Sequence, residues 1–177
     1  MDVKKAIGKR RSIRKYKTNG ISDNLVKELI NAARLAPSGS NRQGARYKVI
    51  SDKGTIQKLR ESRIYPQGFV YTAPVLIICC YDKSAYPRQG EEGDDKFYGT
   101  EHVVRAIRDL SIASSFIVLQ ATELGLGTCY VGWMDKEKIK KILDLPESVE
   151  ALFTITVGYP AEQPEPTPRK SINEITV

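Results

Sequence analysis

The sequence predicts a single α+β domain in which helices pack on a mixed β-sheet. The length of 177 residues fits one compact domain, and neither an internal repeat nor a linker is visible. Helical and strand-like patterns alternate irregularly, which differs from the strict β-α order of a parallel sheet. Residues 74–80 form a continuous apolar run, as expected of a strand that is buried on both faces. We therefore expect a central sheet flanked by helices.

The first 62 residues are expected to contain three helices and one strand. Asp2 is a suitable N-cap for a short first helix. Ser22 is a suitable N-cap for a second helix, whose apolar residues recur at helical spacing until Pro37 stops it. A strand around Tyr47 and a short helix over residues 55–62 follow.

After the apolar strand, residues 82–100 are polar and rich in glycine. We interpret them as a surface excursion, which is either a lid over a site or a loop without that role. Residues 101–124 then predict the longest helix. It is apolar nearly all round from Leu110 to Leu124, so we expect it to be buried and central.

The last third of the chain is expected to add two strands, one helix and a tail. A strand or loop begins at Cys129, Asp135 is a suitable cap for a helix, and residues 152–157 read as a strand. Residues 160–177 contain four prolines, which fix φ and block helix formation, so this tail should be extended. Its apolar end, residues 172–177, is expected to be strand-like.

Composition limits the classes of partner. The formal charge is +7 and the pI about 9.3, which favours an anionic partner such as nucleic acid, an acidic membrane surface or a phosphorylated small molecule. No apolar run approaches the roughly 20 residues that span a bilayer, and the N-terminus is charged from Asp2 onward. We expect a cytoplasmic protein. Its three cysteines are expected to be buried thiols, with no disulfide and no metal site.

The strongest local signal is the segment 10–16, which contains Arg10, Arg11, Ser12 and Arg14. Eight of the fourteen residues from Lys4 to Lys17 are lysine or arginine. A guanidinium presents a planar fork of donors that matches phosphate oxygens, and a serine hydroxyl adds a compact donor. The segment is either a solvated basic surface or a phosphate site.

Several catalytic motifs are missing. The sequence has no GxxxxGK[ST] phosphate loop and no GxSxG nucleophile motif, and its single histidine, His102, argues against a catalytic triad. A lone GxG at 125–127 follows a helix rather than a strand, so it is a weak dinucleotide signal. Few protein groups can carry chemistry, which is typical of an enzyme that uses a cofactor.

Four stretches, taken together, resemble the nitroreductase family. The segment 10–16 is similar to that family's N-terminal flavin signature, and residues 36–43, APSGSNRQ, are similar to its second motif. Residues 121–132, ATELGLGTCYVG, resemble the third motif, and residues 157–160 with the proline-rich tail and Arg169-Lys170 resemble the C-terminal pattern. The four occur in family order over most of the chain.

The resemblance implies an α+β fold that forms an intertwined homodimer with two FMN molecules at the subunit interface. Arg10, Ser12 and Arg14 would hold the FMN phosphate, and Arg169, with Lys170 beside it, would return from the tail to the same phosphate. Arg11 would lie near the pyrimidine side of the flavin or its ribityl chain.

The same resemblance implies contacts to the isoalloxazine ring. The partner subunit would contribute Pro37, Ser38, Gly39 and Asn41, and Gln43 would contact the cofactor or hold that loop. The other face of the ring would be covered by Tyr130, Val131 and Gly132, with Gln67 as a further contact. No protein catalytic residue and no metal is implied.

The function expected from the resemblance is an FMN-dependent oxidoreductase. A hydride would pass from NADH or NADPH through flavin N5 to an electron-poor acceptor, a nitroaromatic, quinone or flavin, by a ping-pong mechanism. The partners would be a second copy of the chain and a small-molecule acceptor, with no nucleic acid and no membrane. Two alternatives stay open: a flavin-binding protein without turnover, and a basic protein that binds nucleic acid through residues 4–17.

Overall fold

Four antiparallel strands form the central sheet of the protein, seen here in a computed structural model that describes residues 2–86 and 102–177. The strands are β1 (Ala45–Ile50), β2 (Val75–Asp82), β3 (Gly127–Val131) and β4 (Val149–Gly158), in the spatial order β1-β2-β4-β3. Parallel pairing occurs, within the described residues, at an isolated bridge between Ser12 and Thr128. The predicted α+β class with flanking helices is confirmed, whereas the pairings of the four strands are antiparallel rather than mixed.

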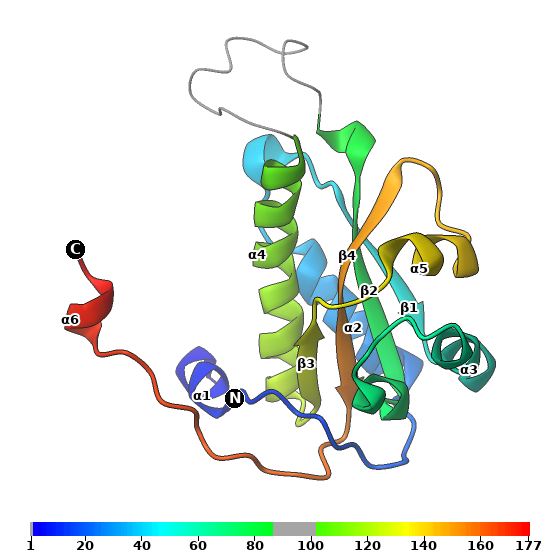
Figure 1. Ribbon diagram of the computed structural model, residues 1–177. Helices are drawn as coiled ribbons and strands as arrows, with labels where there is room; N and C mark the ends of the chain where they lie inside the picture. The colour runs from blue at the N-terminus through cyan, green and yellow to red at the C-terminus, as the bar shows by residue number, and fades with distance from the viewer. Residues whose placement is uncertain (1, 87–101) are drawn as a thin grey trace.

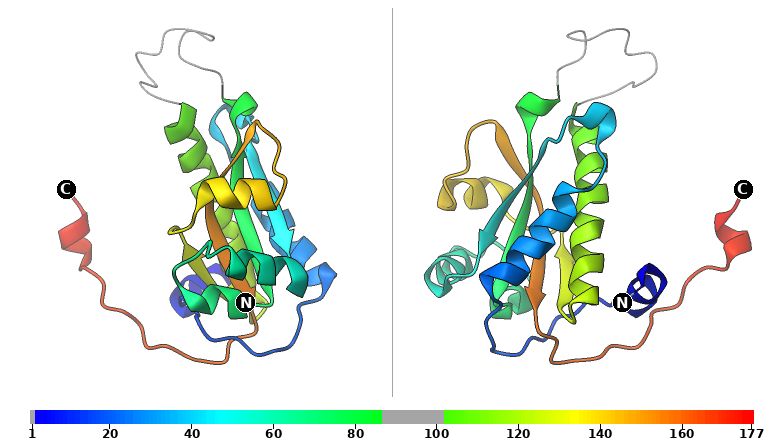
Figure 2. Two further views of the ribbon diagram at one scale, coloured as in Figure 1. Left: turned by 45° about the vertical axis from the view of Figure 1, so that its right-hand side comes forward. Right: turned by 180° about the vertical axis from the view of Figure 1, so that it is seen from behind.

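Helices cover both faces of this sheet (Figures 1 and 2). On one face lie α2 (Asp23–Arg34) and α4 (His102–Glu123), which pack against each other and against the strands. On the other face lie α3 (Lys53–Glu61) and α5 (Lys136–Ile142). A short α1 (Val3–Lys9) packs beside α4. Short 3-10 turns stand at Gly39–Asn41, Gly68–Thr72 and Lys83–Ala85.

Strand β2 is buried on both faces, as the apolar run predicts. Leu76, Ile78 and Cys80 point into the core with α3 and α5, whereas Ile77 and Cys79 point into the core with α2 and α4. All three cysteines are buried free thiols, as expected. Burial raises the pKa of Cys80 to about 12, so this thiol is unreactive at neutral pH.

The predicted helix caps are confirmed. The side chains of Asp2, Ser22 and Asp135 each accept a hydrogen bond from a backbone N–H in the first turn of α1, α2 and α5. Asp52 does the same for α3, which therefore begins at Lys53, two residues before the predicted start. None of the described helices is long and apolar enough to span a membrane.

Helix α4 is only partly buried, which corrects the expectation of a helix covered on all sides. One side, with Leu110 and Ile117, packs into the core. The opposite side is partly exposed and carries Val104, Ile107, Ile112 and Phe116, with exposed fractions between 37% and 53%. An apolar helix is covered either by its own chain or by another one, and its sequence does not distinguish these cases.

Two other expectations are corrected. The C-terminal end is helical rather than strand-like: α6 (Ile172–Ile175) begins where the Ser171 N–H donates to Glu174 Oε2 at 2.8 Å, the side-chain half of a capping box. The predicted excursion also starts later than residue 82, because Asp82 still belongs to β2 and Tyr86 is buried. The rest of that expected excursion, 87–100, lies outside the described residues.

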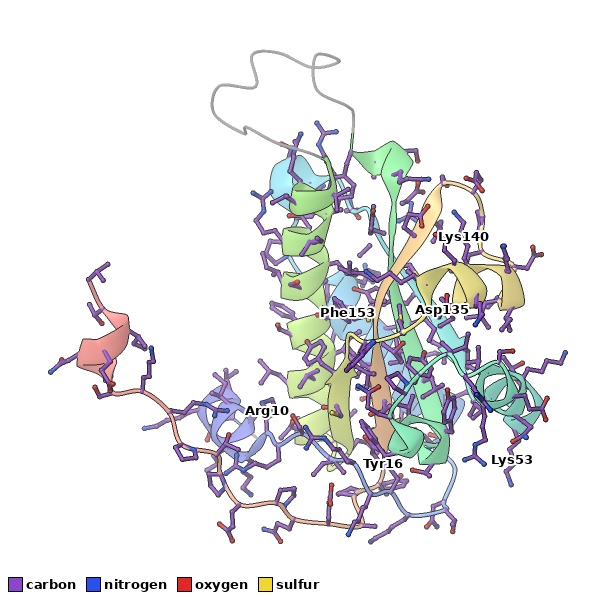
Figure 3. All side chains as sticks on the ribbon, in the orientation of Figure 1. Arg10, Tyr16, Lys53, Asp135, Lys140 and Phe153 are labelled. Carbon is purple, nitrogen blue, oxygen red and sulfur yellow. The ribbon has the colours of Figure 1, made fainter. Side chains whose placement is uncertain are left out.

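The segment that follows α1 is attached to the open edge of the sheet at β3. Its Ile13 N–H donates to the Thr128 carbonyl at 2.9 Å, and the Ile13 side chain is buried directly against Gly127. Further along, the Tyr16 hydroxyl donates to the Ile13 carbonyl and contacts Thr156 Oγ1 at 2.6 Å. Figure 3 shows Tyr16 at the lower end of the sheet. The segment is therefore fixed at both of its ends.

This attachment predicts that Gly127→Ala destabilises the protein. A Cβ at this position would lie 2.7 Å from Ile13 Cγ1 and 2.9 Å from Ile13 Cβ, so Ile13 or the strand must move. We expect a loss of about 1–3 kcal/mol in the free energy of unfolding, measured by denaturant titration. Gly8→Ala in α1 is the matched control, since a Cβ there meets no atom within 4 Å. Equal stability of Gly127→Ala and wild type would contradict the assignment.

Candidate functional site

Five of the predicted site residues gather at one hollow of about 690 Å³. Its lining includes the residues Arg10, Arg11, Ser12, Arg14 and Arg169, which we call the arginine cluster. The first four follow α1, whereas Arg169 comes from the C-terminal tail, which runs past α1 (Figure 1). Lys170 is exposed and does not line the hollow. The two ends of the chain thus bring four guanidinium groups and a hydroxyl to one place.

The backbone of the 10–16 segment explains why these side chains stay at the surface. Successive side chains of an extended segment point to opposite sides. Because Ile13 is buried, its neighbours Ser12 and Arg14 point away from the core. Glu162 Oε1 accepts the backbone N–H groups of Arg14 at 2.6 Å and Lys15 at 3.1 Å. The Arg14 guanidinium lies over the Phe69 ring, 6.0 Å from its centroid, which is a cation–π distance. Figure 3 shows Arg10 between α1 and β3.

Two guanidinium groups of the cluster are held by the chain's own carbonyl groups. Arg11 Nη1 donates to the carbonyls of Gly8 and Arg10, both at 2.8 Å. Arg169 Nη1 donates to Thr167 Oγ1 at 2.6 Å and to the Thr167 carbonyl at 3.2 Å. These bonds orient the planar groups and leave their positive charge in place, so the hollow attracts an anion.

The predicted loop residues Pro37, Ser38, Gly39 and Asn41 form a second group, which we call the 37–41 loop. It follows α2 and contains the 3-10 turn Gly39–Asn41. The loop lies beside α4, where the Gly39 N–H donates to Asp109 Oδ2 at 3.1 Å. Ser38 and Pro37 line a cavity of about 240 Å³ between α2, α4 and β1.

Gln43 holds this loop, the second of the two roles expected for it. Its backbone N–H donates to Ser38 Oγ at 3.0 Å and its Nε2 donates to the Asn41 carbonyl at 3.4 Å. The loop needs such support because Ser40, Asn41 and Gln43 all have φ values of 51–52°. This left-handed conformation is unfavourable for residues other than glycine, with asparagine the most tolerant of the three.

A third group lies at the end of β3. Tyr130 points toward α4, where its hydroxyl donates to Ser114 Oγ at 3.0 Å and its ring packs edge-on against Phe153. Val131 points into the opposite core, so its side chain is not available to a ligand, and Gly132 is exposed. Only the backbone of Val131 and Gly132 can therefore contribute to a site.

Gln67 lies close to this third group. The residues next to it and to Gly132 line one hollow, in which Tyr65 and Pro66 face Trp133 and Met134. The side-chain oxygen of Gln67, Oε1, is buried and has no hydrogen-bond partner among the described residues. A buried carbonyl oxygen without a donor is unfavourable, so this atom is suited to accept a hydrogen bond from a ligand.

The structure brings the first and third groups together and keeps the 37–41 loop apart. Ser12 pairs with Thr128, two residues before Tyr130. The hollow beside Arg10 includes Thr122 of α4, whereas the 37–41 loop contacts Asp109, 13 residues earlier on the same helix. At 1.5 Å per residue this corresponds to about 20 Å along α4. One chain therefore does not place both sets around one small ligand.

Sequence reasoning missed three residues that position the site. Glu162 holds the backbone of the arginine cluster, Tyr16 fixes the end of the same segment, and Asp109 holds the 37–41 loop. Their partners are 70 to 148 residues away, so no local pattern could have shown these contacts.

Comparison with known proteins identifies the family. The family model described as "Nitroreductase family" matches residues 7–64 and 60–159. The chain belongs to the nitroreductase family. A curated relative from Methanothermobacter thermautotrophicus, named a putative NADH dehydrogenase/NAD(P)H nitroreductase, is 34% identical over 169 residues, which cover 93% of this chain and 80% of the relative.

Solved structures agree with this membership. A nitroreductase family protein from Clostridium difficile 630 superposes with a TM-score of 0.82 at 29% identity, covering 100% of this chain and 98% of the other. The NADPH:FMN oxidoreductase of Vibrio harveyi, solved with NAD+, gives a TM-score of 0.84 at 25% identity, covering 99% and 76%. The family, the fold and the enzyme class predicted from the sequence, an NAD(P)H-dependent oxidoreductase, are confirmed.

Proposed function

We propose that this nitroreductase family member is a homodimeric, FMN-dependent enzyme that passes electrons from NADH or NADPH to a small electron-poor acceptor. The observation that carries the proposal is the arginine cluster, in which residues near both ends of the chain surround one hollow. Bound FMN would supply the redox chemistry, taking up a hydride from the nicotinamide and passing it to a nitroaromatic, a quinone or a second flavin in a ping-pong cycle.

The cluster fits the phosphate of FMN in charge and in geometry. A phosphate monoester carries nearly two negative charges at neutral pH and accepts short charge-assisted hydrogen bonds from guanidinium groups. Arg10, Arg14 and Arg169 would neutralise this charge, and Ser12 would add a hydroxyl donor. The lining of this concave hollow includes four arginines and one carboxylate, Glu165, a small and locally positive site that favours a compact phosphate over the extended backbone of a nucleic acid.

The third group fits the ring system of a flavin. Gly132 is exposed next to buried Val131, so the backbone there is open to a flat ligand. Gln67 would direct its unpartnered Oε1 toward a ring N–H. Tyr130 would keep its ring at the edge of the site through the hydrogen bond to Ser114. In this proposal the protein binds and orients, and none of its side chains acts as the acid or base.

A homodimer would bring the 37–41 loop to the same ligand. The loop lies about 20 Å along α4 from the arginine cluster of its own chain, so we propose that it packs against the flavin of the partner subunit. The partly exposed side of α4, with Ile107, Ile112 and Phe116, supports a second copy as the cover, because an apolar surface of this kind commonly marks an interface. Exposed Ile172 and Ile175 on α6 add apolar area at the tail.

The visible absorption spectrum of the purified protein, before and after anaerobic NADPH or NADH, tests the function. We expect flavin bands near one per subunit, bleached by either nucleotide and restored by a quinone or nitroaromatic. Bands that neither nucleotide bleaches would favour a flavin-binding protein without turnover. No bands after incubation with FMN would reject the proposal and leave nucleic-acid binding to be tested.

The phosphate site predicts that Arg10→Ala combined with Arg14→Ala releases FMN and preserves the fold. Each lost hydrogen bond to a charged group costs about 1.5–3 kcal/mol, so the Kd for FMN should rise by at least about 100-fold. Fluorescence titration measures the Kd, and circular dichroism checks the fold. Lys53→Ala with Lys136→Ala, which removes two exposed charges from α3 and α5, is the matched control. A full complement of flavin in the arginine variant would show the assignment to be wrong.

The shared site predicts complementation between two defective chains. One chain carries Arg10→Ala with Arg14→Ala, and the other carries Gly44→Val, whose side chain would overlap the buried Tyr86 ring and displace the adjoining 37–41 loop. Neither homodimer should hold FMN. A heterodimer purified through two different tags should hold one FMN, because one of its two sites combines an intact arginine cluster with an intact loop. A heterodimer without FMN would contradict the shared site, because it would mean that the loop and the arginine cluster of one and the same chain contact each flavin.

A further inference from the structure

Asp109 is the one fully buried charged side chain among residues 2–86 and 103–177, with an exposed fraction of 3%. It lies in the first half of α4, on the side that faces the 37–41 loop. Removing a carboxylate from water is costly unless donors replace the lost hydration. The hydrogen-bond donors around Asp109 therefore indicate which parts of the structure its carboxylate stabilises.

Asp109 accepts hydrogen bonds from two segments that are distant in sequence. Its Oδ2 accepts the Gly39 N–H at 3.1 Å and the Tyr86 hydroxyl at 3.3 Å, and its Oδ1 accepts the Arg108 Nε–H at 3.3 Å. Burial, followed by the nearby Asp109 carboxylate, raises the pKa of Tyr86 to about 12, so this hydroxyl stays a donor at neutral pH. One carboxylate thus joins the loop to the segment after β2.

The loop has no regular structure of its own that would hold it in place. Three of its residues or near neighbours, Ser40, Asn41 and Gln43, are left-handed, which an unconstrained chain would avoid. The internal bonds from Gln43 and Asn41 to Ser38 fix the shape of the loop but not its position on the protein.

Besides the bond from Arg42 Nη1 to the Ala85 carbonyl at 3.4 Å, contacts at two glycines hold the loop in position. Near its start, the Gly39 N–H is held by Asp109 and a side chain on Gly39 would meet Arg108 Nη2 at 2.7 Å. After its end, Gly44 lies so close to the Tyr86 ring that any Cβ would overlap it. Asp109 contacts Gly39 directly and Tyr86 through its hydroxyl, so it supports the loop at both places.

We propose that Asp109 is a positioning residue, which holds the 37–41 loop in the conformation that receives the flavin ring of the partner subunit. The inference rests on the proposed function and deepens it. Asp109 does not touch the ligand; its carboxylate acts through the Gly39 N–H and through Tyr86. Loss of the charge should therefore loosen the loop and change the ring environment while the arginine cluster stays intact.

Three variants of the full-length protein test this. Asp109→Asn preserves the volume and removes the charge, and Tyr86→Phe removes one donor and keeps the ring. The matched control is Asp52→Ala at the start of α3, which removes the N-cap hydrogen bond from the Thr55 N–H, 2.7 Å away, and touches none of the proposed site residues. Each is compared by FMN affinity, by the visible circular dichroism of bound flavin, and by hydrogen exchange at the Gly39 amide.

We expect Asp109→Asn to raise the Kd for FMN by about tenfold to 100-fold, to change the visible circular dichroism and to accelerate exchange at Gly39. Tyr86→Phe should show the same changes at a smaller magnitude. Asp52→Ala should lower the melting temperature and leave all three unchanged at temperatures where the protein is folded. If Asp109→Asn lowers only the melting temperature, like the control, its role is structural and the proposal is overturned.

The outcome for the wild type separates the two proposals. Wild-type protein that holds FMN and is bleached by NADPH, together with an Asp109→Asn variant of unchanged affinity and spectrum, rejects the positioning role alone. Wild-type protein that binds no FMN rejects both.

Discussion

The burial of β2 on both faces is the constraint on which the rest of the structure depends. Each fully buried leucine or isoleucine side chain contributes about 1.5–3 kcal/mol relative to an exposed one, so the strand needs a helix layer on each side. The pairs α2–α4 and α3–α5 supply these layers. With both faces covered, other segments can join the sheet only at its edge strands, β1 and β3, and the 10–16 segment joins it at β3.

The edge at β3 is where the chain gathers its positive charge. The 10–16 segment is attached there by one parallel bridge and by the burial of Ile13, and the tail returns along the segment through the pairing of Tyr16 with Pro160. The 10–16 segment is basic and the tail adds Arg169 beside it, so the gathering of these guanidinium groups is electrostatically unfavourable without a counter-charge. Glu162 supplies part of it by accepting two backbone N–H groups. A bound dianion would supply the rest.

Local features of the fold could be predicted from the sequence. Caps such as Asp2, Ser22 and Asp135 depend on atoms three residues away, and the apolar run of β2 identifies a strand without knowledge of its neighbours. The antiparallel order β1-β2-β4-β3 could not be derived, because strand pairing depends on contacts between segments far apart in the chain. The end of the tail was predicted wrongly because Ser171 and Glu174 favour a helical turn in a short apolar segment.

The candidate site, like the fold, had local features that could be predicted from the sequence and long-range contacts that could not. The resemblance indicated which residues to expect there, and the structure gathers Arg10, Arg14 and Arg169 in one hollow. The contacts that hold the site, from Glu162 and Asp109, bridge 70 or more residues and involve ordinary backbone N–H groups. Such contacts leave no signature in the spacing of residues, so they became visible only in three dimensions.

The left-handed residues of the 37–41 loop have a consequence for how this protein could change. At Ser40 and Gln43, glycine would fit the observed φ better and would raise stability if the geometry alone mattered. Natural proteins retain unfavourable residues of this kind mainly where a site needs a fixed shape. In this loop, selection for thermal stability and selection for activity are therefore expected to favour different residues. A thermostable variant of this chain would have to be chosen by measuring both its stability and its activity.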